Sequence, residues 1–342
     1  MVTSHDVARL AGVSQPTVSR ALRDSPKVSE ETKQRVRQAA RALGYVPSET
    51  GRALSSGRTY RIGLLLTDLD NQFYPHIIAP MHDELDALGY QLMLQTETTD
   101  TATVAERLIA NALDGVVLAT TTVDSVVPVR LRDRGVPFVY FNRTSATIDA
   151  DSATVDPGPG LSETAEAIAG LGHQRVGAIF GPHNTSTGAE REAALREALG
   201  SVGITIGAQY THRGPFDFQT GYVGAQILLG RNPRPTVIVC GNDVVAMGTL
   251  NAARELGVSV PTQVSVVGFD DLPQAAWPLI QLATVAFDLD AMARTAAGLL
   301  VKRAENASGA GFQHAIFPSR LVKRGSLGPA REDAGRFASP KA

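Results

Sequence analysis

The stretch TSHDVARLAGVSQPTVSRAL, residues 3–22, carries one apolar pattern on each side of a glycine. Apolar residues recur at the spacing i, i+3, i+4, namely Val7, Leu10 and Ala11 before Gly12, and Val18, Ala21 and Leu22 after it. This spacing gives each segment one apolar helical face, and glycine is the residue that most readily ends a helix. Two helices joined by so tight a turn form a helix-turn-helix arrangement.

The second predicted helix begins with Ser14, Gln15, Pro16 and Thr17 and continues to Ser19 and Arg20. Polar side chains at a helix N-terminus can donate to phosphates and enter the major groove. Proline is tolerated in a first helical turn because the amide that it lacks has no helical partner there. In the major groove of DNA, Gln15 can bind adenine, and Arg20 can bind guanine or a phosphate. These six residues are the predicted DNA-binding residues; an ordinary three-helix bundle with polar caps is the alternative.

A third helix completes a head that spans residues 1–46. Ser29 is placed to cap this helix, and Glu30 favours its N-terminal dipole. Residues 1–60 hold ten Lys and Arg side chains against five acids, although the whole chain of 342 residues has a net charge of −2. A basic head on an acidic body indicates that the head meets a polyanion, and a solvated basic surface is the alternative.

The composition is that of an ordinary globular protein. Hydrophobic residues make up 43% and charged residues 19%, which provides ample material for a core and excludes disorder of the whole chain. No apolar run of about eighteen residues predicts a transmembrane helix, and the N-terminal residues lack the apolar segment of a signal peptide, so we expect a cytoplasmic protein. Cys240 is the single cysteine, which excludes an internal disulfide and a cysteine-rich zinc site.

The segment DVARLAGVSQPTVSRAL and the following VSEETKQRVRQAARALGYVPS, residues 28–48, resemble the N-terminal part of the lac-repressor (LacI/GalR) family of bacterial transcription regulators. The resemblance continues through PSETGRAL and then over nearly the whole body, to about Pro329. It implies that residues 47–58 are a hinge helix that folds on the operator, with Leu54 entering the minor groove as an apolar wedge. Gly51 stands where the family usually has alanine, which lowers helix propensity by about 1 kcal/mol. A flexible linker is the alternative for the free protein.

After Arg61 the pattern alternates between strands and helices. Apolar runs predict buried strands at 62–66, 91–94, 116–119, 138–141, 176–180, 237–240 and 264–269, and the segment TIGAQY, residues 205–210, is expected to be another. Helices are predicted at 77–88, 190–199 and 244–256. This alternation implies parallel sheets with right-handed crossovers, and two sets of strands imply two lobes.

The predicted fold class is therefore an all-α helix-turn-helix head plus an α/β body of two doubly wound parallel-sheet lobes. The family resemblance implies that the body, residues 59–328, is similar to a type I periplasmic-binding protein. It assigns residues 59–157 and 287–313 to the first lobe, and residues 158–286 and 314–328 to the second. Residues 329–342 contain no leucine and two prolines, so we expect a disordered tail rather than a heptad helix for tetramer assembly.

Ligands of doubly wound sheets bind beyond the carboxyl ends of the strands. Polar side chains follow the predicted strands at Asp68, Asp70, Asn71, Asn142, Arg143, Asn184, Thr185, Thr187, Asn242, Asp243, Asp270 and Asp271, and the aromatic residues Phe73, Tyr74, Phe216, Phe218 and Trp277 lie in the same loops. Amides, carboxylates and arginines suit the hydroxyls of a sugar or polyol, and an aromatic ring can cover its apolar face. The alternative is structural, since Asp243 can cap the helix that begins at Val244 and Tyr74 can belong to the core.

The predicted effector-binding residues are Asn71, Phe73, Asn142, Thr187, Arg191, Phe218, Asn242 and Asp270. Within a motif T-x-x-x-R, Thr187 and Arg191 match residues that bind the effector in the family. Asn242 and Asp270 match the family's effector asparagine and the aspartate that holds sugar hydroxyls. Phe287 stands where many sugar-responding members carry glutamine, so the resemblance does not define the effector.

Two other classes of protein can share such a body, namely an enzyme on a doubly wound fold and a transport solute receptor. The chain has no G-x-G-x-x-G after a strand, no phosphate-binding loop, no G-x-S-x-G and no H-E-x-x-H. The histidines are scattered, and His173 follows a helix end, where it is interpreted as a structural cap rather than a base. We expect no catalytic residue, no metal and no cofactor. The missing signal peptide and the helix-turn-helix head disfavour a transport receptor.

These observations predict an effector-responsive DNA-binding transcriptional regulator, a repressor of genes for the catabolism or uptake of sugars or related carbon sources. One head has too little surface for tight specificity, so we expect a homodimer on a near-palindromic, double-stranded operator and no membrane partner. A small molecule bound between the lobes, expected to be a sugar or sugar derivative, then releases the operator by favouring one arrangement of the lobes. A corepressor-type regulator that responds to a non-sugar metabolite is the alternative.

Overall fold

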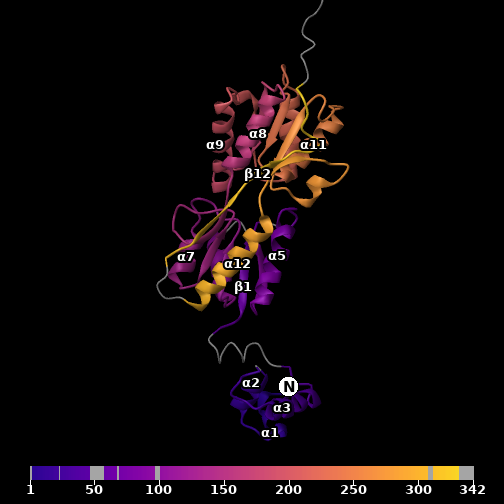
Figure 1. Cartoon of the computed structure of the whole chain (residues 1–342). Helices are drawn as coiled ribbons and strands as arrows, with labels where there is room; N and C mark the ends of the chain where they lie inside the picture. Colours follow the sequence, from indigo (N-terminus) through magenta and orange to yellow (C-terminus); the bar gives the residue numbers. More distant parts are fainter. Residues whose placement is uncertain are drawn as a thin grey trace, which may run out of the picture. The chain divides into compact units, whose positions relative to one another are not determined.

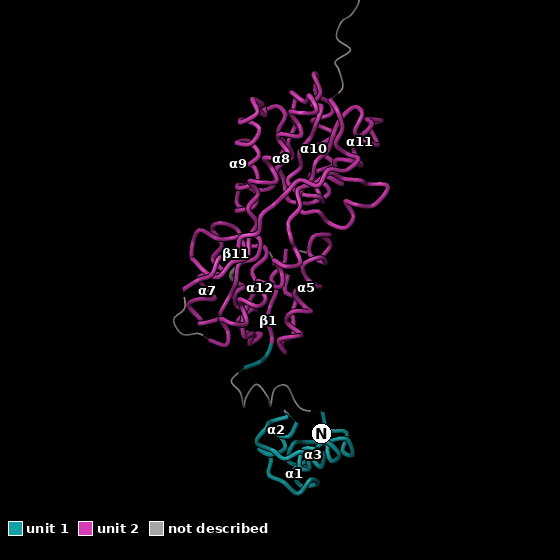
Figure 2. The backbone as a smooth tube through the Cα atoms, in the orientation of Figure 1, with its two compact units in different colours: residues 1–60 teal, residues 61–342 magenta. Residues whose placement is uncertain are grey.

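The computed structural model describes residues 2–22, 24–46, 58–67, 69–96, 101–306 and 311–330. It divides into two compact units, residues 1–60 and 61–342 (Figures 1 and 2). The predicted hinge, with Gly51 and Leu54, lies outside the described residues except for Arg58, and so do residues 331–342 of the predicted tail. No helix within the described ranges is long and apolar enough to span a membrane.

The first unit is the predicted three-helix head, with α1 at Ser4–Ala11, α2 at Gln15–Leu22 and α3 at Glu30–Ala42. The carboxylate of Asp6 accepts hydrogen bonds from the backbone N–H and the hydroxyl of Thr3 (3.0 and 2.8 Å), which fixes the start of α1. Gly12 ends α1 with a left-handed φ of 65°. The buried faces of the three helices pack together through Val7, Ala8, Ala11, Val18, Ala21, Val36, Ala39 and Ala40.

The first lobe of the body contains a six-stranded sheet in the order β11-β5-β4-β3-β1-β2, and all neighbouring strands pair in parallel. Its strands are β1 Arg61–Leu66, β2 Gln91–Thr96, β3 Gly115–Leu118, β4 Phe138–Phe141, β5 Asp151–Asp156 and β11 His314–Pro318. Its helices are α5 Tyr74–Ala87, α6 Thr101–Ala110, α7 Val127–Asp133 and α12 Leu289–Glu305. The helix α12 lies beside α5 against this sheet (Figure 1).

The second lobe contains a six-stranded sheet in the order β12-β10-β9-β8-β6-β7. Its strands are β6 Val176–Phe180, β7 Thr211–Arg213, β8 Val237–Cys240, β9 Ser265–Phe269, β10 Ala283–Ala286 and β12 Arg320–Val322. Its helices are α8 Gly158–Gly170, α9 Ser186–Ser201, α10 Phe218–Leu229 and α11 Asp243–Glu255, with short 3-10 turns at Ala208–Tyr210 and Pro273–Ala276. The pairing is parallel except between β10 and the edge strand β12. The predicted two-lobed α/β architecture is therefore confirmed.

Two details of the prediction differ from the structure. The strand β11 pairs with β5 in the first lobe, from His314 opposite Ser152 to Pro318 opposite Asp156, so the chain returns to the second lobe at Ser319 and not at residue 314. This strand is an edge with alternate residues exposed, so it lacks the continuous apolar run of a buried strand. The segment 205–210 is not a strand. Ile206 is its one residue in the core, its last three residues form a 3-10 turn, and strand pairing begins only after them, at β7.

The end of the body also differs from the prediction. The predicted disordered tail begins at residue 329, but the backbone N–H of Ala330 donates to the carbonyl of Leu171 at 2.8 Å. The buried ring of His173 contacts the hydroxyl of Thr236 and the carbonyl of Gly328, both at 2.9 Å. His173 therefore attaches the last described residues to the second lobe, and burial lowers the pKa of its ring.

Candidate functional site

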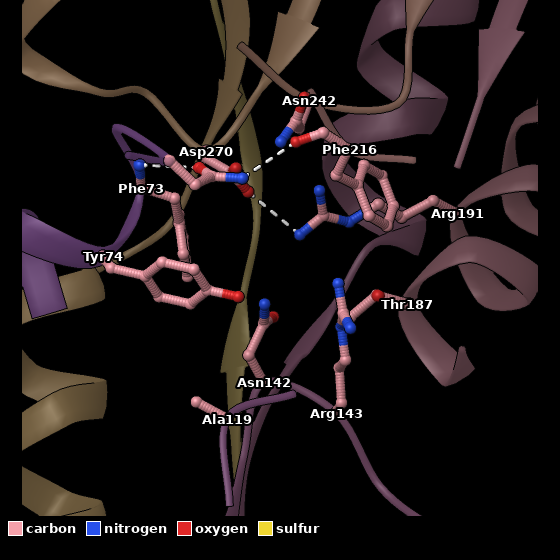
Figure 3. Close-up of a pocket in the computed structure, with 11 residues that line it drawn as sticks. Phe73, Tyr74, Ala119, Asn142, Arg143, Thr187, Arg191, Phe216, Asn242 and Asp270 are labelled. Carbon is pink, nitrogen blue, oxygen red and sulfur yellow. Dashed lines mark hydrogen bonds and ion pairs between the residues drawn. The ribbon is translucent and has the colours of Figure 1, made fainter. Parts of the chain in front are cut away.

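Side chains from both lobes enclose a pocket at the carboxyl ends of the strands (Figure 3). The first lobe supplies Asn71, Phe73, Tyr74, Ala119, Asn142 and Arg143, and the second supplies Thr187, Arg191, Phe216, Asn242 and Asp270. All the predicted effector-binding residues except Phe218 are among them. The cavity between these side chains has a volume of only about 30 Å³, which is room for one or two waters. A larger ligand therefore requires the lobes or the long side chains to move apart.

An ion pair forms the centre of the second lobe's half of the pocket. The guanidinium of Arg191 donates to the carboxylate of Asp270 at 2.9 Å and to the carbonyl of Gly241 at 2.8 Å. It also lies over the ring of Phe269, 3.8 Å from the ring centroid. Both charged side chains are buried, and burial raises the pKa of Asp270 to about 6 although Arg191 opposes that rise. Charge-assisted bonds thus hold both groups in place within the lobe itself.

The backbone turns sharply where it leaves a central strand in each lobe. Asn142, directly after β4, has a φ of 62°, and Asp270 and Asp271, directly after β9, have φ values of 113° and 54°. This left-handed region is unfavourable for residues with a side chain, although Asn and Asp tolerate it better than most. In both lobes the turn places a polar side chain in the pocket, and such backbone strain is characteristic of binding sites.

Two asparagines offer the pocket complementary hydrogen-bonding groups. The Oδ1 atom of Asn242 accepts from the backbone N–H of Val245 at 2.9 Å and caps α11, so its NH2 group is the part that remains for a ligand. The Oδ1 atom of Asn142 is buried and has no hydrogen-bond partner among the residues that the structure describes. A ligand that donates to Asn142 and accepts from Asn242 would satisfy both groups, and a hydroxyl can do either.

The aromatic wall of the pocket is Phe216, whereas Phe218 was the predicted residue. The carboxylate of Asp217 accepts from the N–H of Thr220 at 2.7 Å and caps α10, so Phe218 becomes the first helical residue. Its ring is 43% exposed and stacks on Tyr222 outside the pocket. The ring of Phe216 instead packs onto Gly181, where an added Cβ would lie 2.1 Å from it. Gly181 after β6 and Gly241 after β8 leave the space that the ring of Phe216 occupies. These two glycines were the feature of the sequence that could have indicated an aromatic side chain here.

Of the remaining aromatic candidates, one lines the pocket and one lies outside it. Tyr74 lines the pocket and its hydroxyl contacts that of Thr67 at 2.6 Å, so it is both a core residue and a pocket residue. Trp277 is largely exposed and lies outside the pocket. Within the described parts of the chain, no cluster of His, Cys, Asp and Glu side chains is arranged to hold a metal ion.

The two lobes are bonded directly to each other around the pocket. The amide of Asn71 donates to the carbonyl of Phe216 at 2.9 Å, and its Oδ1 accepts from the N–H of Phe73 at 3.0 Å. The backbone N–H of Thr144 donates to the hydroxyl of Ser186 at 3.0 Å. Asn71 therefore closes one side of the pocket by linking the lobes as well as lining it.

The helix α2 of the head presents part of its predicted DNA-binding set to solvent. Ser14, Pro16 and Arg20 are exposed, whereas Gln15, Thr17 and Ser19 are half-buried. The amide of Gln15 donates to the hydroxyl of Ser4 at 3.2 Å, which ties the start of α2 to α1. Arg20 is thus the long cationic side chain of α2 that is available to bind a base or a phosphate.

Comparison with known proteins agrees with this architecture. Residues 3–48 match the model of the bacterial regulatory proteins of the lacI family, and residues 165–327 match the periplasmic binding protein-like domain. The chain is 32% identical over 345 residues to the HTH-type transcriptional regulator MalR of Streptomyces coelicolor, covering 97% of this chain and 98% of that protein. The chain belongs to the LacI family. It is also 31% identical to the HTH-type transcriptional repressor PurR of Klebsiella pneumoniae, covering 96% and 97% of the two chains.

Solved structures of transcriptional regulators share the whole fold. The lac repressor dimer bound to operator and the anti-inducer ONPF matches with a TM-score of 0.84 at 25% identity, over 96% of this chain and 99% of that one. The complex of the transcriptional regulator CelR with cellobiose matches with a TM-score of 0.72 at 28% identity, over 95% and 100%. This LacI-family protein is therefore similar over almost its entire length to DNA-binding transcriptional regulators.

Proposed function

We propose that this LacI-family regulator is a cytoplasmic repressor that a sugar or sugar derivative releases from its operator. The observation that carries the proposal is the pocket between the lobes, which is lined by the paired Arg191 and Asp270 together with Asn142, Asn242 and the ring of Phe216. Carboxylate, amide and guanidinium groups around an aromatic face suit a polyhydroxylated ring. The similarity to a regulator solved with cellobiose supports the same class of ligand.

The head supplies the DNA contacts in this proposal. Arg20 and the other predicted residues of α2 would bind base edges and phosphates in the major groove, and Leu54 of the hinge would enter the minor groove. A dimer would place two heads on a near-palindromic operator, as the similarity to an operator-bound dimer supports. The genes controlled would be those for uptake or catabolism of the sugar.

The link between the two sites would be the relative arrangement of the lobes. An effector can change DNA affinity only by binding one arrangement more tightly than another. Because Asn71 and Ser186 join the lobes around the pocket, a ligand that moves the lobes apart alters these contacts. That change would decide whether the paired hinges are compatible with the operator.

A second candidate is a corepressor-type regulator that responds to a non-sugar metabolite. Phe287 favours it, because this ring packs against Phe269 with centroids 6.1 Å apart where many sugar-responding members carry glutamine. The ring of Phe287 lines an adjoining cavity that shares Asp270 with the pocket, and an aromatic ring suits a flat, less hydroxylated ligand.

One experiment separates the two candidates. The full chain is screened by thermal shift against hexoses, cellobiose, sugar acids, polyols and nucleobases, and each compound that binds is then added to the protein on operator DNA chosen by selection. A repressor released by a sugar shows a raised Tm and a lowered affinity for the operator with that sugar. A raised operator affinity, or stabilisation by a nucleobase alone, would establish the second candidate instead, and an Arg20→Ala variant that still bound the selected operator fully would contradict the role of α2.

A further inference from the structure

Asp243 is a fully buried acid that lies outside the pocket. It is the first residue of α11, but the cap of that helix is its neighbour Asn242, so the expectation that Asp243 caps it is wrong. One oxygen of Asp243 accepts from the backbone N–H of Leu272 at 2.8 Å, and the other contacts the hydroxyl of Thr284 at 2.5 Å. Asp243 therefore joins α11 to β10 and to the segment that follows β9.

The surroundings of Asp243 are shaped around its carboxyl group. A Cβ atom on Gly268 would lie 2.2 Å from the Oδ1 atom of Asp243, so the glycine leaves the space that the carboxyl occupies. Burial, and then the nearby carboxylate of Asp270, raise the pKa of Asp243 well above its usual range. A neutral amide of the same shape can therefore replace the group, with its oxygen on Leu272 and its NH2 on Thr284.

The segment held by Asp243, residues 270–274, contacts the pocket at one end and the first lobe at the other. Asp270 pairs with Arg191 in the pocket, and the amide of Gln274 lies 3.3 Å from the ring nitrogen of His76 on α5. Between them, Asp270 and Asp271 have left-handed backbone conformations that need an external constraint. The ion pair of Asp271 with Arg324 at 2.6 Å is one such constraint, and the bond from Leu272 to Asp243 is the constraint at the middle of the segment.

We propose that Asp243 is a positioning residue for the effector response, because it holds residues 270–274 so that Asp270 faces Arg191 while Gln274 meets His76. A ligand that moves Asp270 would then also move the contact with the first lobe. The existence of an effector rests on the proposed function. Whether Asp243 holds residues 270–274 in place can be tested without any ligand.

The first test is hydrogen exchange of the full chain followed by mass spectrometry. Asp243→Ala should make the backbone amides of residues 270–272 and of Gln274 exchange about tenfold faster or more, because one lost buried hydrogen bond corresponds to roughly that factor in local opening. Asp243→Asn should stay within about threefold of the native chain, since it keeps both hydrogen bonds. Thr249→Val is the matched control, because Thr249 is buried on the same helix and bonds only within α10, α11 and β8. Unchanged exchange in Asp243→Ala, or an equal increase throughout the second lobe, would overturn the proposal.

The second test is calorimetric titration with D-glucose, D-galactose, cellobiose and D-gluconate. For each of these probes that binds the native chain, Asp243→Ala should weaken binding by about tenfold and Asp243→Asn should restore it to within about threefold. An equal loss in Thr249→Val, or no rescue by asparagine, would show a merely structural role and overturn the proposal. If none of the four probes binds the native chain, the sugar effector is in question, and the exchange experiment still decides the role of Asp243.

Discussion

The two lobes bring unequal halves to the pocket (Figure 3). In the second lobe, Arg191 already donates to Asp270 and to a backbone carbonyl, and Asn242 already accepts from a backbone N–H of α11. In the first lobe, the buried Oδ1 of Asn142 lacks a partner among the described residues. The second lobe is thus a preorganised half-site, whereas the first lobe keeps in Asn142 an acceptor that a ligand can satisfy. We therefore expect the second lobe to set affinity and the first lobe to set the response.

The sharpest way to break this comparison is to remove one member of the central ion pair. Arg191→Ala or Asp270→Ala leaves a buried charge without its partner and removes a charge-assisted hydrogen bond to the ligand, so effector binding should weaken by roughly 3 kcal/mol or more. Calorimetry with a compound from the thermal-shift screen measures the loss. Arg196→Ala is the control, because Arg196 lies on the same helix and pairs with Glu192 outside the pocket. An unchanged ligand-induced thermal shift in both pocket variants would place the effector elsewhere.

A second pair of variants tests the aromatic wall. Phe216→Ala should weaken effector binding by about 2 kcal/mol, because the ring that covers the ligand and supports Arg191 is lost. Phe218→Ala should leave the same binding constant nearly unchanged, since its ring stacks on Tyr222 away from the pocket. The ratio of the two dissociation constants checks the assignment. A larger loss for Phe218→Ala would mean that the sequence-based choice of residue was the better one.

The case of Phe216 shows which parts of the site could be predicted from the sequence. Asn142 and Asp270 follow a buried strand directly, and Asn242 follows one after a single glycine, so the rule that ligands bind at the carboxyl ends of strands predicted them. The choice between Phe216 and Phe218 depends on Asp217 capping α10, which fixes where the helix begins. The role of Asp243 could not be predicted for a related reason. An aspartate at a helix start suggests a helix cap, and only the fold shows that the neighbouring Asn242 caps α11.

In the fold too, some elements could be predicted from the local sequence and others could not. The head was predictable because caps, apolar spacing and Gly12 act within a few residues of one another. The strand β11 was assigned to the wrong lobe because an edge strand that exposes alternate residues depends on a partner far away in the sequence. Local chemistry therefore specifies elements well, while the sheet that an edge strand joins is decided by the rest of the fold.

A smaller effect should appear in the first lobe. Asn142→Ala removes the acceptor that the ligand would satisfy, so effector binding should weaken by roughly 1–1.5 kcal/mol, less than for the ion pair. Asn142→Gly should lose a similar amount of binding but retain more stability, because glycine accepts the left-handed backbone at this position. Thermal unfolding and titration of both variants separate the two effects. A loss as large as that of Asp270→Ala would remove the distinction between the lobes.

The smallest expected effect is a pH dependence that tests whether the second lobe is preorganised without a ligand. Because burial raises the pKa of Asp270 to about 6 in the folded chain, the folded state retains a proton that the unfolded state releases at lower pH. This group therefore makes the protein less stable as pH rises, and its contribution should fall by roughly 1 kcal/mol between about pH 5 and 6.5. Paired acids such as Glu192, whose pKa the neighbouring arginines lower, act in the opposite direction, so the measurement must be a difference. The free energy of unfolding of the native chain minus that of Asp270→Asn should decline across this range, because asparagine does not titrate. A flat difference would mean that Asp270 is solvated in the free protein, and that the ligand, rather than the second lobe, assembles the pair with Arg191.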